Sequence, residues 1–305
     1  MSKLPILVTF YNRPEILERL LINLKNFDNV DIFFAHDYGA SNFDQQKVMK
    51  SRSLINKYFP DTPKNHIKSH SKHLGCKLGM KLNIDWFFTM CKNGVILEDD
   101  CIPSEKFIIE TRRLLKTYEN SEKIMMISGF QPLPPTRTSQ FFNLTLFPSV
   151  WGWATWSHKW KLYDLKIQNI SNLVYSMANK LYPNDKNYII QKQLFIYKFK
   201  KIFLDVNNNL IDTWDYSLLA SMWNNEMFGL VFPSNQVINI GFGPNATHTK
   251  RKLTSKISNS INVLKLGSPL DLNLDIDSER WIVKNVHKVN LYQFLKSKLK
   301  VFFNI

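Results

Sequence analysis

Three consecutive carboxylates, Glu98, Asp99 and Asp100, follow directly after a short apolar run in this sequence. The apolar run predicts a buried strand, and Pro103 prevents that strand from continuing inside a sheet. Adjacent acids at the end of a buried strand repel one another and lose their hydration, so they need a positive partner. A divalent cation would provide it, and a solvated turn is the alternative for this motif taken alone.

The first third of the chain alternates strand and helix patterns. Apolar runs at 5–10 and 30–35 predict two strands before the one that ends in the acids. Apolar residues at helical spacing predict helices at 16–24, 45–58 and 77–90. This order predicts an α/β fold with a parallel sheet covered by helices. Ligands of such sheets bind beyond the carboxyl ends of the strands, where the three acids are expected.

The second half is richer in aromatic residues. A basic segment at 170–204 is predicted to be helical, a further helix is expected from 212 to 223, and 229–233 reads as a strand. Because no repeat and no low-complexity linker separates the halves, we expect one unit, divided at 1–105 and 106–250, with a basic extension at 251–305.

Charge and cysteine content limit the partners and the compartment. The chain of 305 residues has 40 Lys and Arg against 25 Asp and Glu, a formal charge of +15 that favours nucleotides, nucleic acids or anionic membranes. Its three cysteines form no CxxC pair, which suits a reducing compartment. Neither a signal peptide nor a membrane-spanning run is evident. We therefore expect a cytoplasmic protein that can touch the inner face of the inner membrane.

Trp151, Trp153 and Trp156 lie within six residues. Indole rings suit stacking on the apolar faces of sugars, and packing in the core is the alternative. In a regular strand Trp151 and Trp153 would share one face, whereas a turn at Gly152 would remove that restriction.

Two further residues are candidates for chemistry. Asp215 lies in the first turn of a predicted helix between Trp214 and Tyr216, an apolar setting that suits a general base. Stabilising the helix end is its alternative role. His248 precedes three cations in a loop with two glycines, so it could approach a diphosphate or a metal, with an exposed or structural role as the alternative.

Five motifs in this order resemble bacterial glycosyltransferases of the GT-A fold, close to the family-two enzymes: Thr9–Pro14, Leu97–Asp100, Trp151–Trp156, Thr213–Tyr216 and Asn239–Thr249. The acid triplet and the later Trp-Asp also resemble animal N-acetylglucosaminyltransferase I. The resemblance implies a mixed, mainly parallel sheet flanked by helices, with a helical C-terminal extension. It also implies metal-dependent transfer of a sugar, with inversion, from a nucleotide-diphosphate sugar, above all a UDP-sugar. The implied acceptor is a hydroxyl of a cell-surface glycan or glycolipid, such as lipopolysaccharide or capsule.

The resemblance also assigns roles to residues of this chain. Asp100 would bind Mn²⁺ or Mg²⁺, with His248 a further metal candidate, while Glu98 and Asp99 would contact the donor sugar and ribose. Asp215 would be the catalytic base. The nucleotide sugar would be held in the 1–105 half by Thr9, Phe10, Tyr11, Arg13, Asp37 and Lys77, and sugar rings would meet Trp151, Trp153 and Trp214. The usual family-two triplet is Asp-X-Asp, and Glu-Asp-Asp here leaves the division of labour within the triplet open.

Other functions and the C-terminal tail complete the set of expectations. Six apolar residues of the tail fall on one helical face: Leu291, Phe294, Leu295, Leu299, Phe302 and Phe303. This pattern suits a helix lying on anionic lipid or one docked on the protein's own core. A nucleic-acid-binding protein would explain the charge, but no motif of that class is present, so we expect no nucleic acid as partner. A noncatalytic carbohydrate-binding module would explain the Trp run but not the acids. The oligomeric state stays open.

Overall fold

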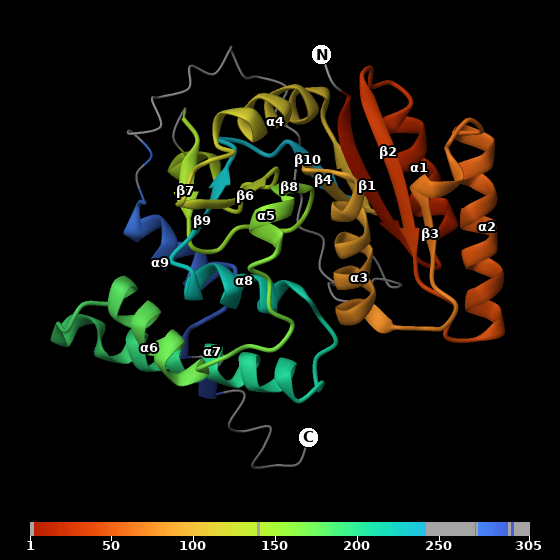
Figure 1. The fold of residues 1–305 in the computed structure, drawn as a ribbon. Helices are drawn as coiled ribbons and strands as arrows, with labels where there is room; N and C mark the ends of the chain where they lie inside the picture. The colour runs from red at the N-terminus through yellow and green to blue at the C-terminus, as the bar shows by residue number, and fades with distance from the viewer. Residues whose placement is uncertain (1–2, 139–140, 242–271, 273, 292–293, 296–305) are drawn as a thin grey trace.

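The structure, a computed structural model, describes residues 3–138, 141–241, 272, 274–291 and 294–295. Eight strands form one sheet in the order β3-β2-β1-β4-β8-β6-β9-β7, and a small second sheet pairs β5 with β10 (Figure 1). In chain order the strands are β1 (Leu4–Phe10), β2 (Val30–His36), β3 (Ile67–Ser69), β4 (Asn93–Glu98), β5 (Cys101–Pro103), β6 (Ile124–Ser128), β7 (Asn143–Thr145), β8 (Trp153–Trp156), β9 (Phe228–Val231) and β10 (Val237–Asn239).

The sheet is mixed and mainly parallel, as expected. The neighbours β3, β2, β1 and β4 run parallel, and β6 and β9 form another parallel pair. β8 is antiparallel to both β4 and β6, and β7 is antiparallel to β9. The α/β class with flanking helices is therefore confirmed.

Helices cover both faces of the sheet. They are α1 (Pro14–Leu24), α2 (Asn42–Tyr58), α3 (Gly75–Met90), α4 (Glu105–Thr117), α5 (Ser157–Trp160), α6 (Ile170–Leu181), α7 (Ile189–Asn207), α8 (Asp215–Asn224) and α9 (Ile276–Asn285). The segment expected to be helical at 170–204 is helical over most of its length, but it divides into α6 and α7 because the chain is extended at Tyr182. Pro183 explains the break, since the residue before a proline is disfavoured in the helical conformation. Within the described residues, no helix is both long and apolar enough to cross a membrane.

The two-residue period of the strands separates two apolar cores. Ile6 and Val8 of β1 belong to the core that α1, α2 and α4 cover, whereas Leu7 belongs to the core beneath α3. All three side chains are fully buried. Because successive side chains of a strand point to opposite faces, the parallel strands β1, β2 and β4 each contribute to both cores.

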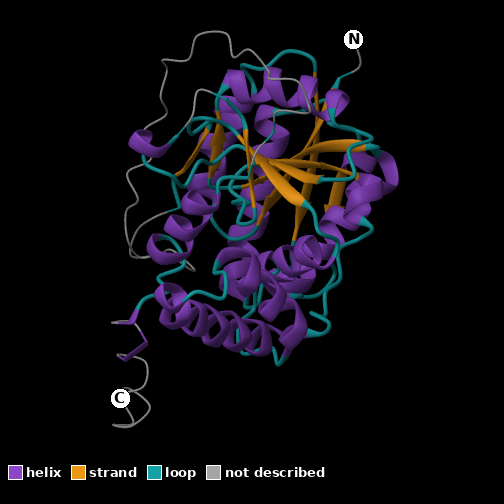
Figure 2. Ribbon diagram, turned by 90° about the vertical axis from the view of Figure 1, so that its left-hand side faces the viewer, coloured by secondary structure: helices purple, strands orange, loops and turns teal. Residues whose placement is uncertain are grey.

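A third core holds the helices of the second half together. Phe195, Phe199 and Phe203 of α7 pack with residues of α6, α8 and α9, including Ile282. In Figure 2 helices lie below the strands, at the height where Figure 1 shows α6 and α7. The part of the predicted C-terminal extension that forms α9 is thus packed into this core, while most of the amphipathic tail lies outside the described residues.

One buried carboxyl fastens α9 to the sheet. Glu279 is 2% exposed, and its Oε2 accepts a hydrogen bond of 2.8 Å from the backbone N–H of Leu146. Burial raises the pKa of Glu279 to about 8, and the hydrogen bonds that it accepts only partly oppose this. The folded protein therefore holds this carboxyl in its protonated form at neutral pH.

Replacement of this carboxyl by an amide should reduce the pH dependence of stability. In the wild type, the folded pKa of about 8 lies above the ordinary value of 4.5, so the stabilising contribution of Glu279 is complete at acid pH and is lost as the pH rises through 8. We expect Glu279→Gln to be more stable than the wild type at about pH 9, by at least about 1 kcal/mol, and to change less between about pH 5 and pH 9. Urea unfolding at the two pH values measures this. Glu122→Gln, a change of an exposed carboxylate, is the control, and an unaltered pH slope in Glu279→Gln would contradict the assignment.

Candidate active site

A cavity of about 620 Å³ opens at the carboxyl ends of β1, β2 and β4. Its wall continues over the first turns of α3, the segment that leads into α8, and the residues that follow β10. Most of the residues predicted to bind a nucleotide sugar line this cavity, as do six carboxylates: Asp37, Glu98, Asp99, Asp100, Asp212 and Asp215.

The acid triplet is paired with Arg13. This residue precedes α1, and its guanidinium donates to both oxygens of Asp99, through Nη2 to Oδ1 and through Nε to Oδ2 at 3.2 Å. Its Nη1 lies 3.0 Å from Oδ2 of Asp100. Arg13, which was predicted to hold the nucleotide sugar, therefore serves first as the counter-ion of two buried acids.

The pKa values in this cluster follow from burial and crowding. Burial raises the pKa of Glu98 to about 8, with the charges of Asp100 and Asp99 adding to the effect. Burial also raises the pKa of Asp99, to about 6, although the guanidinium of Arg13 opposes the shift. For Arg13 burial opposes the charge, but the neighbouring carboxylates outweigh it and raise its pKa. Glu98 and Asp99 therefore bind protons at a higher pH than ordinary carboxylates do.

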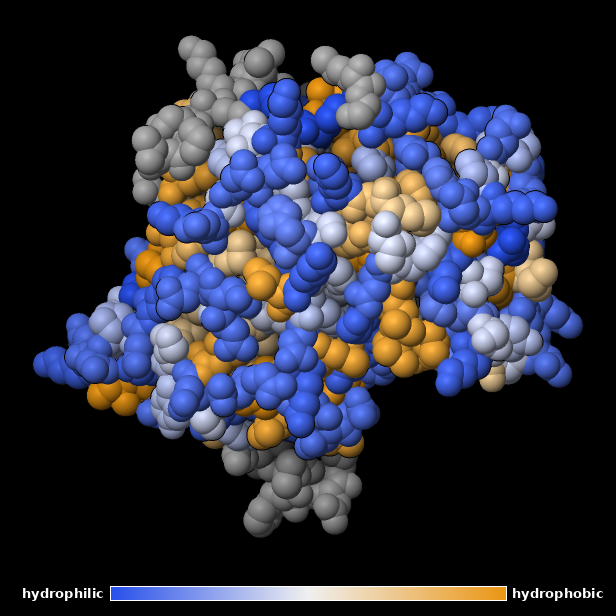
Figure 3. Space-filling model, viewed as in Figure 1, coloured by the Kyte–Doolittle hydropathy of each residue, from blue (hydrophilic) through white to orange (hydrophobic). Residues whose placement is uncertain are grey.

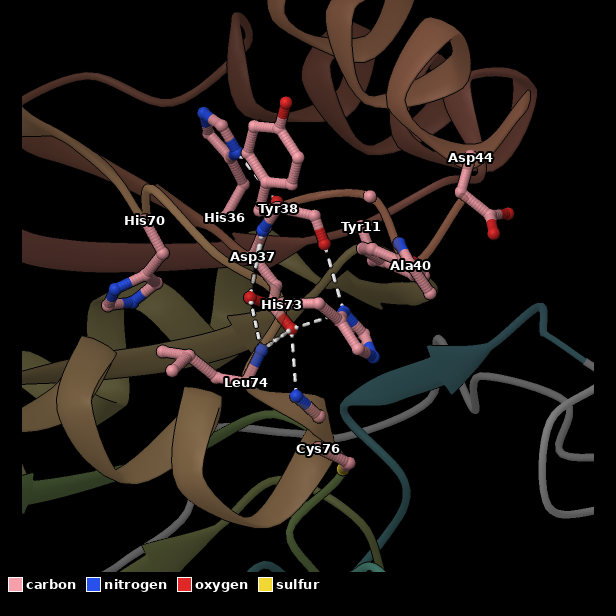
Figure 4. A network of polar contacts seen from close by, with 12 residues as sticks. Tyr11, His36, Asp37, Tyr38, Ala40, Asp44, His70, His73, Leu74 and Cys76 are labelled. Carbon is pink, nitrogen blue, oxygen red and sulfur yellow. Dashed lines mark hydrogen bonds and ion pairs between the residues drawn. The ribbon is translucent and has the colours of Figure 1, made fainter. Parts of the chain in front are cut away.

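Asp37 is engaged by the start of α3 (Figure 4). Its carboxylate accepts hydrogen bonds from the backbone N–H groups of Leu74, at 2.9 and 3.0 Å, and Gly75, at 2.9 Å. The N–H of Tyr38 donates to Oδ1 at 2.8 Å, and Nδ1 of His73 lies 2.9 Å from Oδ2. Both oxygens of Asp37 are therefore occupied by the protein itself, which leaves little capacity for the predicted contact to the nucleotide sugar.

Asp212 closes the same helix end from the other half of the chain. Its Oδ2 accepts from the N–H of Cys76 at 2.8 Å, and its Oδ1 from the N–H of Lys77 at 2.9 Å. Gly75 has a φ of +78°, and a Cβ there would lie 2.6 Å from Oδ2 of Asp212. Glycine is required here by both its backbone conformation and this close approach. Two carboxylates thus satisfy the four N–H groups that begin α3.

The side chain of Lys77 points away from the cavity. Its Nζ donates to the carbonyl of Val206 at 2.8 Å and lies 3.4 Å from Oδ1 of Asn209. A cation is favoured at the C-terminus of a helix, where carbonyl groups lack partners within the helix. Lys77 therefore caps α7. Its side chain does not line the cavity, where the predicted contact to the donor would have to be made.

Asp215 reaches the cavity from the first turn of α8. Its Oδ1 accepts from the hydroxyl of Thr213 and, at 2.9 Å, from the backbone N–H of Tyr216. No residue in the described part of the chain donates a hydrogen bond to Oδ2. The hydrogen bonds to Oδ1 consequently hold the carboxylate of Asp215 in one orientation.

The Trp run is divided by a turn. Gly152 has a φ of +63°, so Trp151 and Trp153 need not share a face. Trp151 is half-buried and lines the cavity, whereas Trp153 is 1% exposed and does not. Trp214 is 2% exposed at the cavity wall, and its ring stacks on that of Trp153 with centroids 5.5 Å apart. Core packing therefore accounts for Trp153, and Trp151 is the tryptophan of the run that can meet a sugar.

The residues that end β1 form the remaining wall. Thr9 is buried, and its hydroxyl donates to the carbonyl of Leu97 at 3.3 Å. The ring of Phe10 lies 5.0 Å from that of His36. The hydroxyl of Tyr11 accepts from the N–H of Ala40 at 2.7 Å. Of this group, Tyr11 is the most available to a ligand, because it is half-buried while Thr9 and Phe10 are buried.

The cavity residues that were not predicted from the sequence include His73, Asn239 and Asp212. His73 lies in a polar loop with no periodic pattern, and Asn239 was visible only as part of a motif. Nδ2 of Asn239 donates to Oδ1 of Asp100 at 3.2 Å. Asp212 lies three residues before the predicted base Asp215, which could have marked it as a site residue. The sequence pattern around it predicted only the start of a helix. His248 lies outside the described residues.

The described residues do not form a complete metal site by themselves. Among them, no group of three or more His, Cys, Asp and Glu residues is arranged to hold a metal ion. Asp100 offers a carboxylate in the cavity that is paired at 3.0 Å with Arg13. Mg²⁺ and similar hard cations are often held by one or two carboxylates together with substrate phosphates, and this donor set fits such a shared arrangement.

Comparison with known proteins gives structural similarity at low identity. No protein-family profile and no curated protein sequence matches the chain. A cytidylyltransferase from Leptospira borgpetersenii serovar Hardjo-bovis is 14% identical over 53% of this chain, with a TM-score of 0.34, and the match spans 64% of that protein. A mannosyltransferase from Pyrobaculum calidifontis, solved with GDP-Man and Mn²⁺, is 11% identical over 72% of this chain and 73% of that one, with a TM-score of 0.39. S. aureus TarS 1-349, solved with UDP-GlcNAc, is 11% identical over 77% of this chain and 57% of that one, with a TM-score of 0.38.

Loss of the guanidinium should destabilise the protein in a pH-dependent manner. Arg13→Gln leaves the buried carboxylates of Asp99 and Asp100 without their cation, so we expect the free energy of unfolding to fall by about 2–4 kcal/mol at about pH 8. The loss should be smaller at about pH 5, because the pKa values of Asp99 and Glu98, about 6 and about 8, allow protonation instead. Urea unfolding at both pH values tests this.

A matched surface arginine provides the control. Arg113 pairs with Glu110 on α4, where its side chain is 41% exposed. We expect Arg113→Gln to change the free energy of unfolding by less than about 1 kcal/mol at either pH. Equal effects of the two substitutions, or a larger loss for Arg13→Gln at acid pH, would contradict the proposed electrostatic role.

Proposed function

We propose that this protein is a metal-dependent glycosyltransferase of the GT-A fold. It moves a sugar from a nucleotide-diphosphate sugar, above all a UDP-sugar, to a hydroxyl of a glycan or glycolipid acceptor, with inversion at the anomeric carbon. The observation that carries this proposal is the cavity at the ends of the parallel strands, where Asp215 and the acid triplet line the same space.

The charge of the cavity supports a role for a divalent cation. Six carboxylates line it, and Arg13 is the one arginine or lysine among the lining residues that the structure describes. The whole chain has a formal charge of +15, so this concentration of acids is a local departure from the rest of the molecule. A donor diphosphate is itself an anion, and it would be repelled from this space unless a cation entered with it. A mixed site of carboxylate, cation and diphosphate resolves that repulsion.

Asp100 is the residue that we propose to hold Mn²⁺ or Mg²⁺, together with oxygens of the donor diphosphate. Its carboxylate is oriented by Asn239 on one side and by Arg13 on the other. The bound cation would act as a Lewis acid for the departing diphosphate. Glu98 and Asp99 then remain for the sugar and ribose hydroxyls, which carboxylates accept readily. His248 stays a further proposed ligand.

Asp215 is the proposed general base. Its Oδ1 is held by Thr213 and by the N–H of Tyr216, so Oδ2 can take the proton from the acceptor hydroxyl. As it loses its proton, the oxygen of the acceptor hydroxyl forms a bond to the anomeric carbon of the donor sugar. The bond from that carbon to the diphosphate oxygen breaks at the same time. The electron pair leaves with the nucleoside diphosphate, and attack from the opposite side inverts the configuration.

Removal of the base should affect turnover far more than donor binding. In Asp215→Asn the amide cannot accept the hydroxyl proton, so we expect kcat to fall by about 10²-fold or more, with the Kd of the donor changed by less than about threefold. Steady-state kinetics with a panel of UDP-, GDP- and dTDP-sugars, and calorimetric titration of the donor, measure the two effects.

Asp205→Asn is the matched control for this substitution. Asp205 lies in α7, where its carboxylate forms an exposed pair with Lys201 at 2.7 Å. Near wild-type turnover is expected for this variant. If Asp215→Asn also retained near wild-type turnover, Asp215 would not be the base.

Binding of a nucleoside diphosphate should require a divalent cation. We expect UDP to bind at least about tenfold more tightly in Mn²⁺ than in a chelator, because the carboxylates repel an unaccompanied diphosphate. Asp100→Asn should lose most of this dependence, whereas Asp61→Asn, an exposed residue that does not line the cavity, should keep it. Calorimetry gives both affinities. Equally tight binding in the chelator would contradict a shared metal site.

Two other classes of protein fit the cavity less well. A carbohydrate-binding module needs exposed aromatic platforms, but Trp153, Trp156 and Trp214 are all 2% exposed or less. A nucleic-acid-binding protein needs a basic surface against phosphates, whereas this cavity is acidic.

We propose an oligosaccharide or glycolipid as acceptor, of the lipopolysaccharide or capsule kind, on the strength of the motif resemblance to bacterial enzymes. Its place of action would be the cytoplasm, at the inner face of the membrane.

A further inference from the structure

Large aliphatic side chains are exposed along α7. Ile189 and Ile190 at its start are 57% and 61% exposed, Leu204 near its end is 49% exposed, and Leu210 just beyond it is 73% exposed. Ile190 and Leu204 are separated by 14 positions, close to four helical turns, so they lie on the same side of the helix. The opposite side is fully used, because Phe195, Phe199 and Phe203 are buried in the core of the second half.

Lysines accompany these aliphatic residues. The segment 170–211 contains six lysines, two aspartates and no other charged residue. Nζ of Lys200 lies 4.6 Å from the ring centroid of Tyr175, which joins the exposed faces of α6 and α7. Lys201 pairs with Asp205 at 2.7 Å. The α7 surface, defined here as Ile189, Ile190, Lys200, Lys201, Leu204 and Leu210, therefore combines aliphatic side chains with two lysines, of which Lys201 is paired with Asp205.

The position of this surface makes it accessible to a flat partner. Figure 1 shows α6 and α7 along the lower edge of the molecule, while α4 lies at the upper edge. In Figure 3 apolar and hydrophilic residues alternate over the part of that lower edge that is not drawn in grey. Exposed aliphatic side chains next to lysines offer the two kinds of contact that an anionic bilayer surface favours, apolar insertion and charge attraction.

We propose that the α7 surface docks on a membrane that contains anionic lipid. The aliphatic side chains would enter the region of the headgroups, and the lysines would pair with anionic lipid phosphates. This surface differs from the predicted amphipathic tail, because it belongs to a helix that is packed into the core of the protein.

The same helix leads directly to the candidate active site. Its last turn is capped by Lys77 of α3 through the carbonyl of Val206. The chain then passes through exposed Leu210 to Asp212 and Asp215, both at the cavity wall. A membrane in contact with this surface would bring a lipid-linked acceptor close to the cavity. That consequence for the acceptor rests on the proposed function, whereas membrane docking does not.

Vesicle binding by the full chain tests the proposal. Sedimentation with phosphatidylcholine vesicles, alone or mixed with phosphatidylglycerol, gives the partition coefficient without donor or turnover. We expect binding to the mixed vesicles, and a loss of about tenfold or more in Ile189→Glu/Ile190→Glu, because two carboxylates replace apolar contacts and repel the lipid. Lys200→Gln/Lys201→Gln should weaken binding and reduce its dependence on salt.

Two controls separate this proposal from its alternatives. Ile109 on α4 is 58% exposed, and we expect Ile109→Glu to bind vesicles as the wild type does. Asp215→Asn should also bind normally, so failure of the catalytic proposal would leave this one intact. The inference is overturned if Ile189→Glu/Ile190→Glu binds mixed vesicles as well as the wild type. It is also overturned if that variant loses self-association in sedimentation velocity while vesicle binding is unchanged, since the surface would then contact a second copy of the chain.

Discussion

The start of α3 is the junction on which the geometry of the cavity depends. Asp37, at the end of β2, and Asp212, from the segment before α8, together accept the four N–H groups that open this helix. Lys77 makes a second link between the two halves of the chain, because its Nζ on α3 caps the end of α7. Because Asp212 lies three residues before Asp215, these bonds hold the proposed base close to the start of α3. The same bonds use up the N–H groups that could otherwise bind a phosphate at a helix N-terminus.

Electrostatics then explain why the cavity contains both acids and Arg13. Carboxylates buried at the end of β4 would be unstable without a cation, and Arg13 provides one that is covalently part of the chain. It neutralises part of the negative charge only, as the raised pKa values of Glu98 and Asp99 indicate. A site of this kind can accept a further cation together with an anionic donor, which is the physical basis of the proposed transfer reaction.

Several elements could be predicted from local pattern, and several contacts could not. β1, α1 and β4 were predicted because their apolar residues follow the periods of a buried strand or an amphipathic helix. The break between α6 and α7 was missed, although Pro183 marks it. Trp151 and Trp153 could not be told apart until Gly152 was seen to adopt a positive φ. The capping roles of Asp212 and Lys77 had no local signal, since each partner is more than 100 residues away.

The amino-acid order alone determined the α/β class, the position of the acid triplet after a buried strand, and the set of motifs that resemble glycosyltransferases. These follow from periodicity and from the cost of burying like charges, which are properties of neighbouring residues. Tertiary structure decided which acids have a partner: Asp37 and Asp212 bind the start of α3, Asp99 and Asp100 pair with Arg13, and Asp215 keeps one oxygen without a donor among the described residues. The physical reason is that hydrogen bonds and ion pairs depend on separations of about 3 Å, which only the folded chain establishes between residues that are distant in sequence.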